Sequence, residues 1–314
     1  MTQSTSRRMF LQRLTTAVLV APFAIGASTT RAVTPFARSG KPRLLPGLAA
    51  YSLRDHFKDS DHKRGGQVPE GERIDMFQFI DYCADQGCVG AELTSYYFPA
   101  NVTDDYLLRV KRHAFLRGVA ISGSAIGNTF THPRGEKRDA EIALARRWID
   151  RTALMGATHL RVFAGDLRGT TAEEAKKRCI GALEECAAYA GTRGVMLGLE
   201  NHGGIVAEAD DILEILRTVQ SPWVGINLDT GNFHTADPYR DLERCAPYAV
   251  NVQLKVEMQK KGGPKEEADL ERAVKILSSA NYQGYVTLEY EATENPYAAI
   301  PRHIKRIKSL LGAA

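Results

Sequence analysis

One stretch of the sequence decides which fold to expect: residues 194–204 read GVMLGLENHGG. The apolar run Val195–Leu199 is short and closely flanked by glycine, which predicts a buried strand rather than a helix. Glu200, Asn201 and His202 follow directly. A carboxylate, an amide and an imidazole thus emerge together at the end of a strand, and this arrangement is typical of an enzyme site.

Two other apolar runs end in the same way. Gly225–Leu228 leads into Asp229, and Tyr285–Leu288 leads into Glu289. Acidic residues at the exits of three separate strands predict one site that is assembled from distant parts of the chain.

Strand-like and helix-like patterns alternate through the rest of the chain. The expected strands are Leu45–Tyr51, Cys88–Leu93, Val119–Ser124, His159–Phe163, Val195–Glu200, Val224–Asp229, Val250–Val256 and Tyr285–Glu289. Between them, apolar residues recur at three- and four-residue spacing, for example in Ile74–Ala84 and Ile212–Val219. This number of units is typical of a (β/α)8 TIM barrel. A doubly wound open sheet is the alternative, but no Gly-x-Gly-x-x-Gly turn follows the first strand.

Several predicted helices end in glycine just before the next strand. These glycines are Gly87, Gly118, Gly156, Gly194 and Gly284. A helix often ends at a residue in the left-handed conformation, which glycine adopts without strain. The pattern therefore predicts five helix ends.

The amino terminus resembles a secretion signal. Ser6–Leu11 contains the arginine pair of a twin-arginine motif, and the apolar stretch Ala17–Ala27 has the length of a signal core. A transmembrane helix is the rival interpretation, but it needs about 20 apolar residues. We expect residues 1–32 to be a signal peptide, residues 33–44 an extended lead-in and residues 45–314 the barrel. The protein is then exported by the twin-arginine translocation machinery to the periplasm.

Charge and cysteine content narrow the class of partner. Four of the 41 basic residues lie in the first 32 positions, which hold no acid, so 37 basic and 37 acidic residues remain. Nucleic-acid binding normally needs a surplus of clustered Lys and Arg, so we expect a small-molecule ligand. Self-association of the protein stays open.

The cysteines lack zinc-type spacing and are expected to be buried thiols; they are Cys83, Cys88, Cys179, Cys186 and Cys245.

In a barrel of this kind, residues at the carboxyl ends of the strands meet around one mouth. The strand exits supply Tyr51, Arg54, Glu92, Asn128, Arg161, Glu200, His202, Asp229, Asn232, Gln253, Lys255 and Glu289. Structural alternatives exist: Arg161 or Glu92 as half of an ion pair, and Tyr51 as part of the core. Three carboxylates converging in one cavity repel one another unless a cation balances them. Glu200, Asp229 and Glu289 therefore predict a divalent metal.

These motifs, in this order, resemble a known family. They are Glu200-Asn201-His202 after the fifth strand, Asp229 at the end of the sixth, Val-x-Val-x-x-Lys over 250–255 and Gly-Tyr-Val-x-x-Glu over 284–289. Over residues 45–312 the chain resembles the xylose isomerase-like TIM barrels, specifically the sugar phosphate isomerase/epimerase family. The resemblance implies metal binding by Glu, Asp, His and Glu from strands five to eight. On this chain those positions are Glu200, Asp229, Gln253 and Glu289.

Two positions depart from the family pattern. Gln253 replaces the expected histidine, although its carbonyl oxygen is a suitable ligand for Mn²⁺ or Mg²⁺. Co²⁺ and Zn²⁺ are further candidates. Alternatively, His202 or His234 supplies a nitrogen, or the site has lost its metal. Asn232 stands where sugar epimerases often carry a substrate-binding histidine, which leaves the identity of the sugar open.

The resemblance implies a reaction in which a proton is removed next to a carbonyl group and an enediolate forms. Glu200 and Glu289 are the expected catalytic pair. The expected substrate-binding residues are His202, Lys255, Asn232, Glu92, Arg161 and Tyr51. His202 as a turn cap and Lys255 as a partner of Glu257 are the structural alternatives.

Export favours free or oxidised sugars and glycosides over sugar phosphates as substrates. The same site could instead act as a 3-keto-glycoside lyase, or the chain could be a non-catalytic periplasmic sugar-binding barrel. An endonuclease of this fold is a third, disfavoured option, because such enzymes use a histidine-rich zinc cluster and basic DNA-facing loops, whereas the histidines here are scattered and the charge is balanced. The polar segment Arg54–Glu72 is interpreted as either a lid or a flexible surface loop.

Overall fold

The computed structural model describes residues 32–60 and 68–312. The expected signal peptide lies outside the described residues, apart from Ala32. Residues 61–67, in the middle of the segment expected to form a lid or loop, also lie outside them. Among the described residues, no helix is long and apolar enough to cross a membrane.

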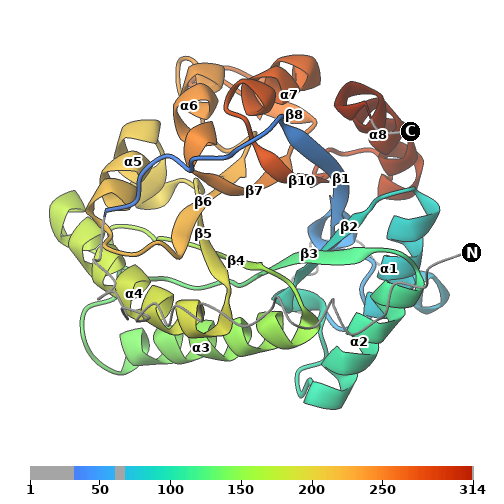
Figure 1. The fold of residues 1–314 in the computed structure, drawn as a ribbon, viewed down its shortest axis with the longest axis horizontal. Coiled ribbons are helices and arrows are strands. Elements are labelled where there is room, and N and C mark those ends of the chain that lie inside the picture. Colours follow the sequence, from blue (N-terminus) through green and yellow to red (C-terminus); the bar gives the residue numbers. More distant parts are fainter. Residues whose placement is uncertain (1–31, 61–67, 313–314) are drawn as a thin grey trace, which may run out of the picture. The chain divides into compact units, whose positions relative to one another are not determined.

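Eight parallel strands close into a barrel, as Figure 1 shows. The predicted TIM barrel is therefore confirmed. In the order in which they neighbour one another, the strands are β1 (Arg43–Ala49), β10 (Gln283–Leu288), β7 (Ala249–Leu254), β6 (Val224–Asp229), β5 (Met196–Glu200), β4 (His159–Val162), β3 (Ala120–Ala125) and β2 (Gly90–Thr94). Each begins and ends within two residues of the prediction.

Helices follow the strands and surround the barrel (Figure 1). They are α1 (Met76–Asp85), α2 (Asp104–Leu116), α3 (Glu136–Met155), α4 (Ala172–Arg193), α5 (Ala209–Thr218), α6 (Pro238–Cys245), α7 (Leu270–Ser279) and α8 (Pro296–Leu311). Short 3-10 turns occupy Ala50–Leu53, Glu70–Glu72, Ser95–Tyr97, Gly204–Val206 and Ala246–Tyr248. Local sequence sets the helix starts: Asp75 caps α1 reciprocally with Gln78, and Thr171 caps α4.

The glycine prediction is confirmed at four helix ends and wrong at the fifth. Gly156 and Gly194 adopt left-handed conformations directly after α3 and α4, with φ of 82° and 68°. Gly87 and Gly118 are also left-handed. Gly284 instead lies within β10. After α7 the left-handed residue is Asn281, with φ of 52°, because asparagine tolerates this conformation better than most side chains.

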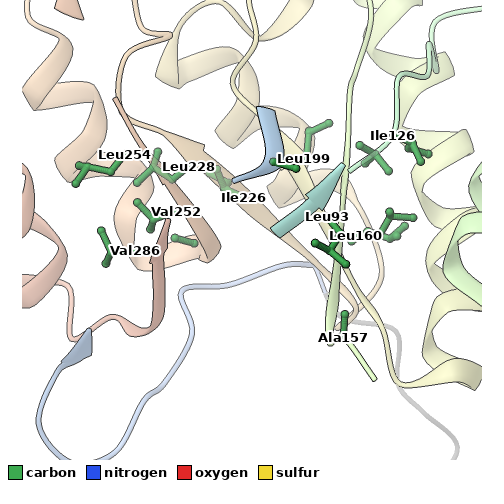
Figure 2. Packing of buried hydrophobic residues seen from close by; sticks show 14 of the residues in the cluster. Leu93, Ile126, Ala157, Leu160, Leu199, Ile226, Leu228, Val252, Leu254 and Val286 are labelled. Carbon is green, nitrogen blue, oxygen red and sulfur yellow. The ribbon is translucent and has the colours of Figure 1, made fainter. Parts of the chain in front are cut away.

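Alternating side chains divide each strand between the helices and the barrel interior. In β7, Val252 and Leu254 belong to the apolar core, where they lie beside residues of β6 and β10 (Figure 2). The residues that alternate with them face inward: Asn251 and Gln253 both donate hydrogen bonds to Glu92 of β2. Because β10 and β1 separate β7 from β2, these bonds must cross the interior. The strands thus carry a polar inner face that the apolar periodicity alone does not reveal.

The lead-in lies against the end of the barrel opposite the expected site. Residues 32–42 have no helix or strand, and β1 begins at Arg43. The backbone N–H of Val33 donates to Val219, that of Phe36 donates to Pro247, and Asn281 donates to the carbonyl of Arg38. All three partners precede strands, so the lead-in covers the amino-terminal end of the barrel.

A small antiparallel hairpin after β7 was not predicted. Its strands are β8 (Glu257–Gln259) and β9 (Lys265–Glu267). The hairpin follows the carboxyl end of β7 and therefore stands beside the barrel mouth. The five cysteines are buried and free, as expected.

Candidate active site

A cavity of about 410 Å³ opens at the carboxyl ends of the strands. It contains seven of the ten residues predicted to be catalytic, substrate-binding or metal-binding, and also Arg54. Its lining comprises Tyr51, Arg54, Tyr96, Arg161, Phe163, Glu200, His202, Asn232, Lys255, Lys265, Glu289 and Glu291. A larger open groove of about 620 Å³ lies on the outside of the barrel, by α6 and α7, away from the buried carboxylates. The cavity at the mouth is therefore the candidate active site.

Glu200 ends β5 and is almost completely buried, with 3% of its surface exposed. The Nε atom of Arg161 lies 2.9 Å from one carboxylate oxygen. The amide of Asn232 donates to the other oxygen at 3.1 Å. Both oxygens of Glu200 therefore have a positively polarised partner.

Lys255 directly follows β7 and reaches into a group of acidic side chains. Its Nζ atom lies 2.5 Å from Glu289 Oε2 and 3.3 Å from Asp229 Oδ2, and it also contacts the carboxylate of Glu291. Lys255 is 7% exposed. We refer to Arg161, Glu200, Asp229, Lys255, Glu289 and Glu291 as the mouth cluster.

Burial and pairing act in opposite directions on the acidic groups of the mouth cluster. Burial raises the pKa of Glu200 to about 7, against the opposing effect of Arg161. It likewise raises the pKa of Asp229 and that of Glu289 to about 7, against the effect of Lys255. For Lys255, burial alone lowers the pKa, but Asp229, Glu289 and Glu291 outweigh it, so the net shift is upward. These carboxyl groups can exchange protons near neutral pH.

The side-chain carbonyl oxygen of Gln253 was expected to bind a metal. In the structure, both the oxygen and the nitrogen of this amide are hydrogen-bonded to other side chains. The oxygen accepts a hydrogen bond from Asn227 at 2.6 Å. The amide nitrogen donates to Glu92 at 2.7 Å and to Glu289 at 3.3 Å. Two carboxylates facing this nitrogen fix the orientation of the amide, because only a donor can satisfy both.

The predicted metal ligands lie around the same end of the barrel, but their arrangement does not fit a divalent ion. Gln253 is engaged by Asn227, Glu200 by Arg161, and both Asp229 and Glu289 by Lys255. Across the described residues, no group of three or more His, Cys, Asp or Glu side chains is arranged to hold a metal. Metal binding stays a prediction.

Below the mouth cluster, a second set of inward-facing residues links four positions across the barrel. We call Glu92, Asn227, Asn251 and Gln253 the amide network. Asn251 donates to Glu92 at 2.6 Å and to Asn227 at 2.7 Å. Glu92 is fully buried and is not part of the cavity lining. The predicted contact between Glu92 and a substrate therefore has no support in this arrangement, because Gln253 lies next to Glu92 and reaches on to Glu289.

Aromatic rings form another part of the cavity wall. Tyr51 was predicted, whereas Tyr96 and Phe163 were missed. The rings of Phe163 and His202 lie 4.5 Å apart between centroids, and the Arg161 guanidinium lies 4.0 Å from the Phe163 centroid. Both missed residues follow strands, β2 and β4, so the strand-exit rule would have found them. Flat rings beside charged groups suit a ligand with both C–H and O–H surfaces.

Lys255, His234 and Asn128 each have well-defined surroundings in the structure. Lys255 pairs within the mouth cluster, and Glu257 instead lies 3.8 Å from Lys265. His234 is exposed and lines a neighbouring pocket rather than this cavity. Asn128 exchanges hydrogen bonds with the backbone of Phe163, and so it positions the loop after β4.

The exposed His202 completes the rim of the cavity. Its pKa is lowered by partial loss of water and by the positive charge of Arg161. The imidazole is therefore neutral at neutral pH and can both donate and accept a hydrogen bond.

Solved structures with the same fold include sugar epimerases. The chain is 15% identical to the D-psicose 3-epimerase of Clostridium cellulolyticum H10, with a TM-score of 0.63 over 83% of this chain and 89% of that one. It is 16% identical to the 3-keto-D-glucoside 4-epimerase of E. coli, with a TM-score of 0.63 over 86% and 100%. A xylose isomerase-like TIM barrel protein from Mycobacterium smegmatis, solved in complex with magnesium, gives 17% identity and 0.65 over 85% and 96%.

Sequence comparison adds a family-level match. A search of curated proteins finds no significant relative. The family model described as xylose isomerase-like TIM barrel matches residues 80–310, which is most of the chain. This range contains the five strands whose ends carry the mouth cluster, β4, β5, β6, β7 and β10, together with the strands of the amide network. The chain belongs to the xylose isomerase-like TIM barrel family.

Proposed function

We propose that this protein is a sugar isomerase or epimerase that moves a proton at a carbon next to a carbonyl group. The observation that carries the proposal is the pairing of Glu200 and Glu289 in one cavity. Both are buried and both line the cavity; Glu289 raises the pKa of Glu200, and Glu200 raises that of Asp229. They lie at the ends of β5 and β10, which two other strands separate. A bound sugar between them would present opposite faces to the two groups.

The two glutamates are suited to complementary roles. With pKa values of about 7, one carboxyl group can be ionised while the other is protonated at neutral pH. The ionised group removes a proton from carbon, and the bonding electrons move toward the carbonyl oxygen. The protonated group then returns a proton. Return to the same carbon on its other face gives an epimer, and return to the neighbouring carbon gives an aldose–ketose isomer.

The remaining cavity residues would bind and orient the sugar. His202 and Asn232 offer hydrogen bonds to hydroxyl groups, and Tyr51 contributes an aromatic surface at the mouth. The fold likeness to sugar epimerases supports a carbohydrate ligand without specifying which one. The size of the cavity, about 410 Å³, is adequate for a monosaccharide or a small glycoside.

Solvent-deuterium incorporation tests the proposal. The purified protein is incubated in D₂O with ketoses, aldoses and 3-keto-glycosides, and exchange at each carbon is followed by NMR. We expect exchange at one carbon beside the carbonyl of at least one sugar. Loss of the C1 substituent together with exchange would identify the lyase reaction. No exchange in any panel member, with the fold intact, would favour the sugar-binding alternative.

We also propose that the chain is exported by the twin-arginine route, on the evidence of the motif around Arg7 and Arg8. Replacing both arginines with lysine should retain the precursor in the cytoplasm. Cell fractionation and sequencing of the mature amino terminus measure this. Normal periplasmic accumulation of the doubly substituted chain would contradict the proposal.

A further inference from the structure

One ammonium group occupies the centre of the acidic part of the mouth cluster. Lys255 Nζ contacts carboxylates of Asp229, Glu289 and Glu291, which come from β6 and from the segment after β10. A buried ammonium is costly unless acidic partners surround it. Here the ammonium group of Lys255 balances the charge of three carboxylates. The sequence had suggested a divalent metal for this charge-balancing role.

The local backbone is built to hold the lysine in this position. The backbone N–H of Lys255 donates to Thr230 Oγ1 at 2.9 Å, which fixes the start of the side chain. The aliphatic part of the Lys255 side chain, its stem, then passes over Gly231. A Cβ atom at Gly231 would lie 2.6 Å from Lys255 Cγ, closer than real carbon atoms approach each other. Glycine at position 231 therefore leaves the space that the lysine stem fills.

The other expected ligand positions have fixed partners of their own. The carbonyl oxygen of Gln253 accepts a hydrogen bond from Asn227, and Glu200 is held by Arg161 and Asn232. A divalent ion would have to displace a buried ammonium and a buried hydrogen bond to gain these ligands. It would also find an amide where the family resemblance implies an imidazole.

We propose that Lys255 takes the place of the divalent cation in this barrel, so that the protein balances and uses its mouth carboxylates without a bound metal. In the reaction, the ammonium group donates a hydrogen bond to the substrate's carbonyl oxygen. As a glutamate removes the proton from carbon, the electron pair moves to this oxygen, and Lys255 stabilises the charge while keeping its own proton. The catalytic part of this inference rests on the proposed function, whereas the absence of metal binding does not.

Metal binding is measured directly on the full chain, independently of turnover. Mn²⁺ is titrated into the wild-type protein, and the loss of the free-ion signal is followed by electron paramagnetic resonance. Thermal unfolding is recorded with Mn²⁺, Mg²⁺, Co²⁺ and Zn²⁺. We expect no stoichiometric binding and a midpoint that moves by less than about 1 °C.

A designed gain of binding provides the matched comparison. Lys255→Met combined with Gln253→His removes the ammonium and supplies an imidazole. We expect this variant to bind Mn²⁺ and to unfold roughly 5 °C higher at a hundredfold excess of the ion over its Kd. Gln253→His alone should not bind, because Lys255 still occupies the centre. Lys275→Met, on the exposed face of α7, is the control for losing a lysine.

Stoichiometric binding of Mn²⁺ to the wild-type protein, abolished by Asp229→Asn, would overturn the inference. A deuterium-exchange activity that disappears after chelation and returns with Mn²⁺ would also overturn it. If the double variant does not fold, these two wild-type measurements still decide. A protein that neither binds metal nor exchanges deuterium would contradict the proposed function and leave the position of Lys255 supported.

Discussion

Glu92 and Glu289 are both buried carboxylates inside one barrel, yet their surroundings shift their pKa values in opposite directions. For Glu92, burial favours the neutral form, but His159, Gln253 and Arg161 outweigh it and lower the pKa. For Glu289, burial prevails over Lys255 and raises the pKa to about 7. Glu92 stays charged at neutral pH, and Glu289 can change its protonation state.

The difference follows from the neighbours rather than from depth. The two oxygens of Glu92 accept hydrogen bonds from Asn251 and Gln253, and His159 Nε2 lies 3.7 Å from one of these oxygens. The mouth cluster places several carboxylates around two cations, so repulsion between acids adds to the cost of burial. The network therefore holds a fixed charge, whereas the cluster is suited to moving protons. Gln253 connects the two sets because it donates to Glu92 and to Glu289.

The largest effect is expected from removing a proton-transfer group in the mouth cluster. Glu289→Gln should lower the deuterium-exchange rate by about 10²–10⁴-fold, because an amide cannot take up the proton. The unfolding midpoint at pH 7 should change little, since Lys255 keeps Asp229 and Glu291 as partners. NMR exchange and circular dichroism measure the two quantities. Glu271→Gln, on the surface of α7, is the control, and full activity in Glu289→Gln would remove this residue from proton transfer.

A substitution in the amide network should have the opposite effect: it should lower stability strongly and activity only slightly. Glu92→Leu removes one acceptor from each of the buried amides of Asn251 and Gln253, which should lower the free energy of unfolding by about 3 kcal/mol. Urea titration measures this loss. Glu92→Gln retains one acceptor and should lose less. Because Glu92 does not line the cavity, exchange per folded molecule should fall far less than in Glu289→Gln; an equal fall would place Glu92 in the reaction.

The stability of the fold should depend on pH in opposite ways through the mouth cluster and through the amide network. A carboxyl group whose pKa is higher in the folded than in the unfolded chain binds protons more tightly when folded, so stability falls as pH rises between the two values. For Glu289 this window runs from about 4.5 to about 7. Its contribution should amount to about 3 kcal/mol. Glu92, with a lowered pKa, instead stabilises the fold above its unfolded pKa, and this contribution is lost as pH falls.

Urea unfolding at pH 5, 6, 7 and 8 tests this prediction in the wild type and in Glu289→Gln. The wild type should lose more stability across the series, because the variant lacks one group with a raised pKa. Parallel curves for the two proteins would show that Glu289 titrates alike in the folded and unfolded states.

The smallest effect is expected at the rim of the cavity. His202 is exposed and contacts Phe163 rather than the carboxylates. His202→Ala should raise KM by up to about tenfold through the loss of one hydrogen bond to the sugar. The unfolding midpoint should not change. A loss of kcat as large as that of Glu289→Gln would give His202 a part in the chemical step.

Much of the fold could be predicted because the signals are local. The apolar runs gave all eight barrel strands to within two residues, and four of five glycines marked helix ends correctly. The errors lie where local signals are weak: Gly284 is part of β10, and the β8–β9 hairpin has strands of only three residues. Short charged strands carry little apolar periodicity, so sequence patterns do not identify them.

The sequence predicted where most of the site residues lie, but it did not predict which residues contact one another. Glu200, Lys255 and Glu289 line one cavity, as the strand-exit rule implied. Glu92 follows the same rule but lies below the cavity. Its depth depends on the register between β2 and its neighbours, including the shift between Ala91 and Glu92 relative to β3. Register between distant strands is a property of the assembled barrel.

Alternation and strand ends are encoded over a few neighbouring positions, so the barrel, its strands and the residue types at its mouth could all be predicted from the sequence. The hydrogen-bond and ion-pair partners of these residues are instead set by the assembled barrel. Lys255 meets Asp229 and Glu289 across strands, and Gln253 turns its oxygen to Asn227 and its nitrogen to Glu92. Three buried carboxylates can be balanced either by a metal ion or by a lysine. Which of the two applies depends on distances of a few ångströms between residues far apart in the chain, because electrostatic interactions in a buried site change steeply over such distances.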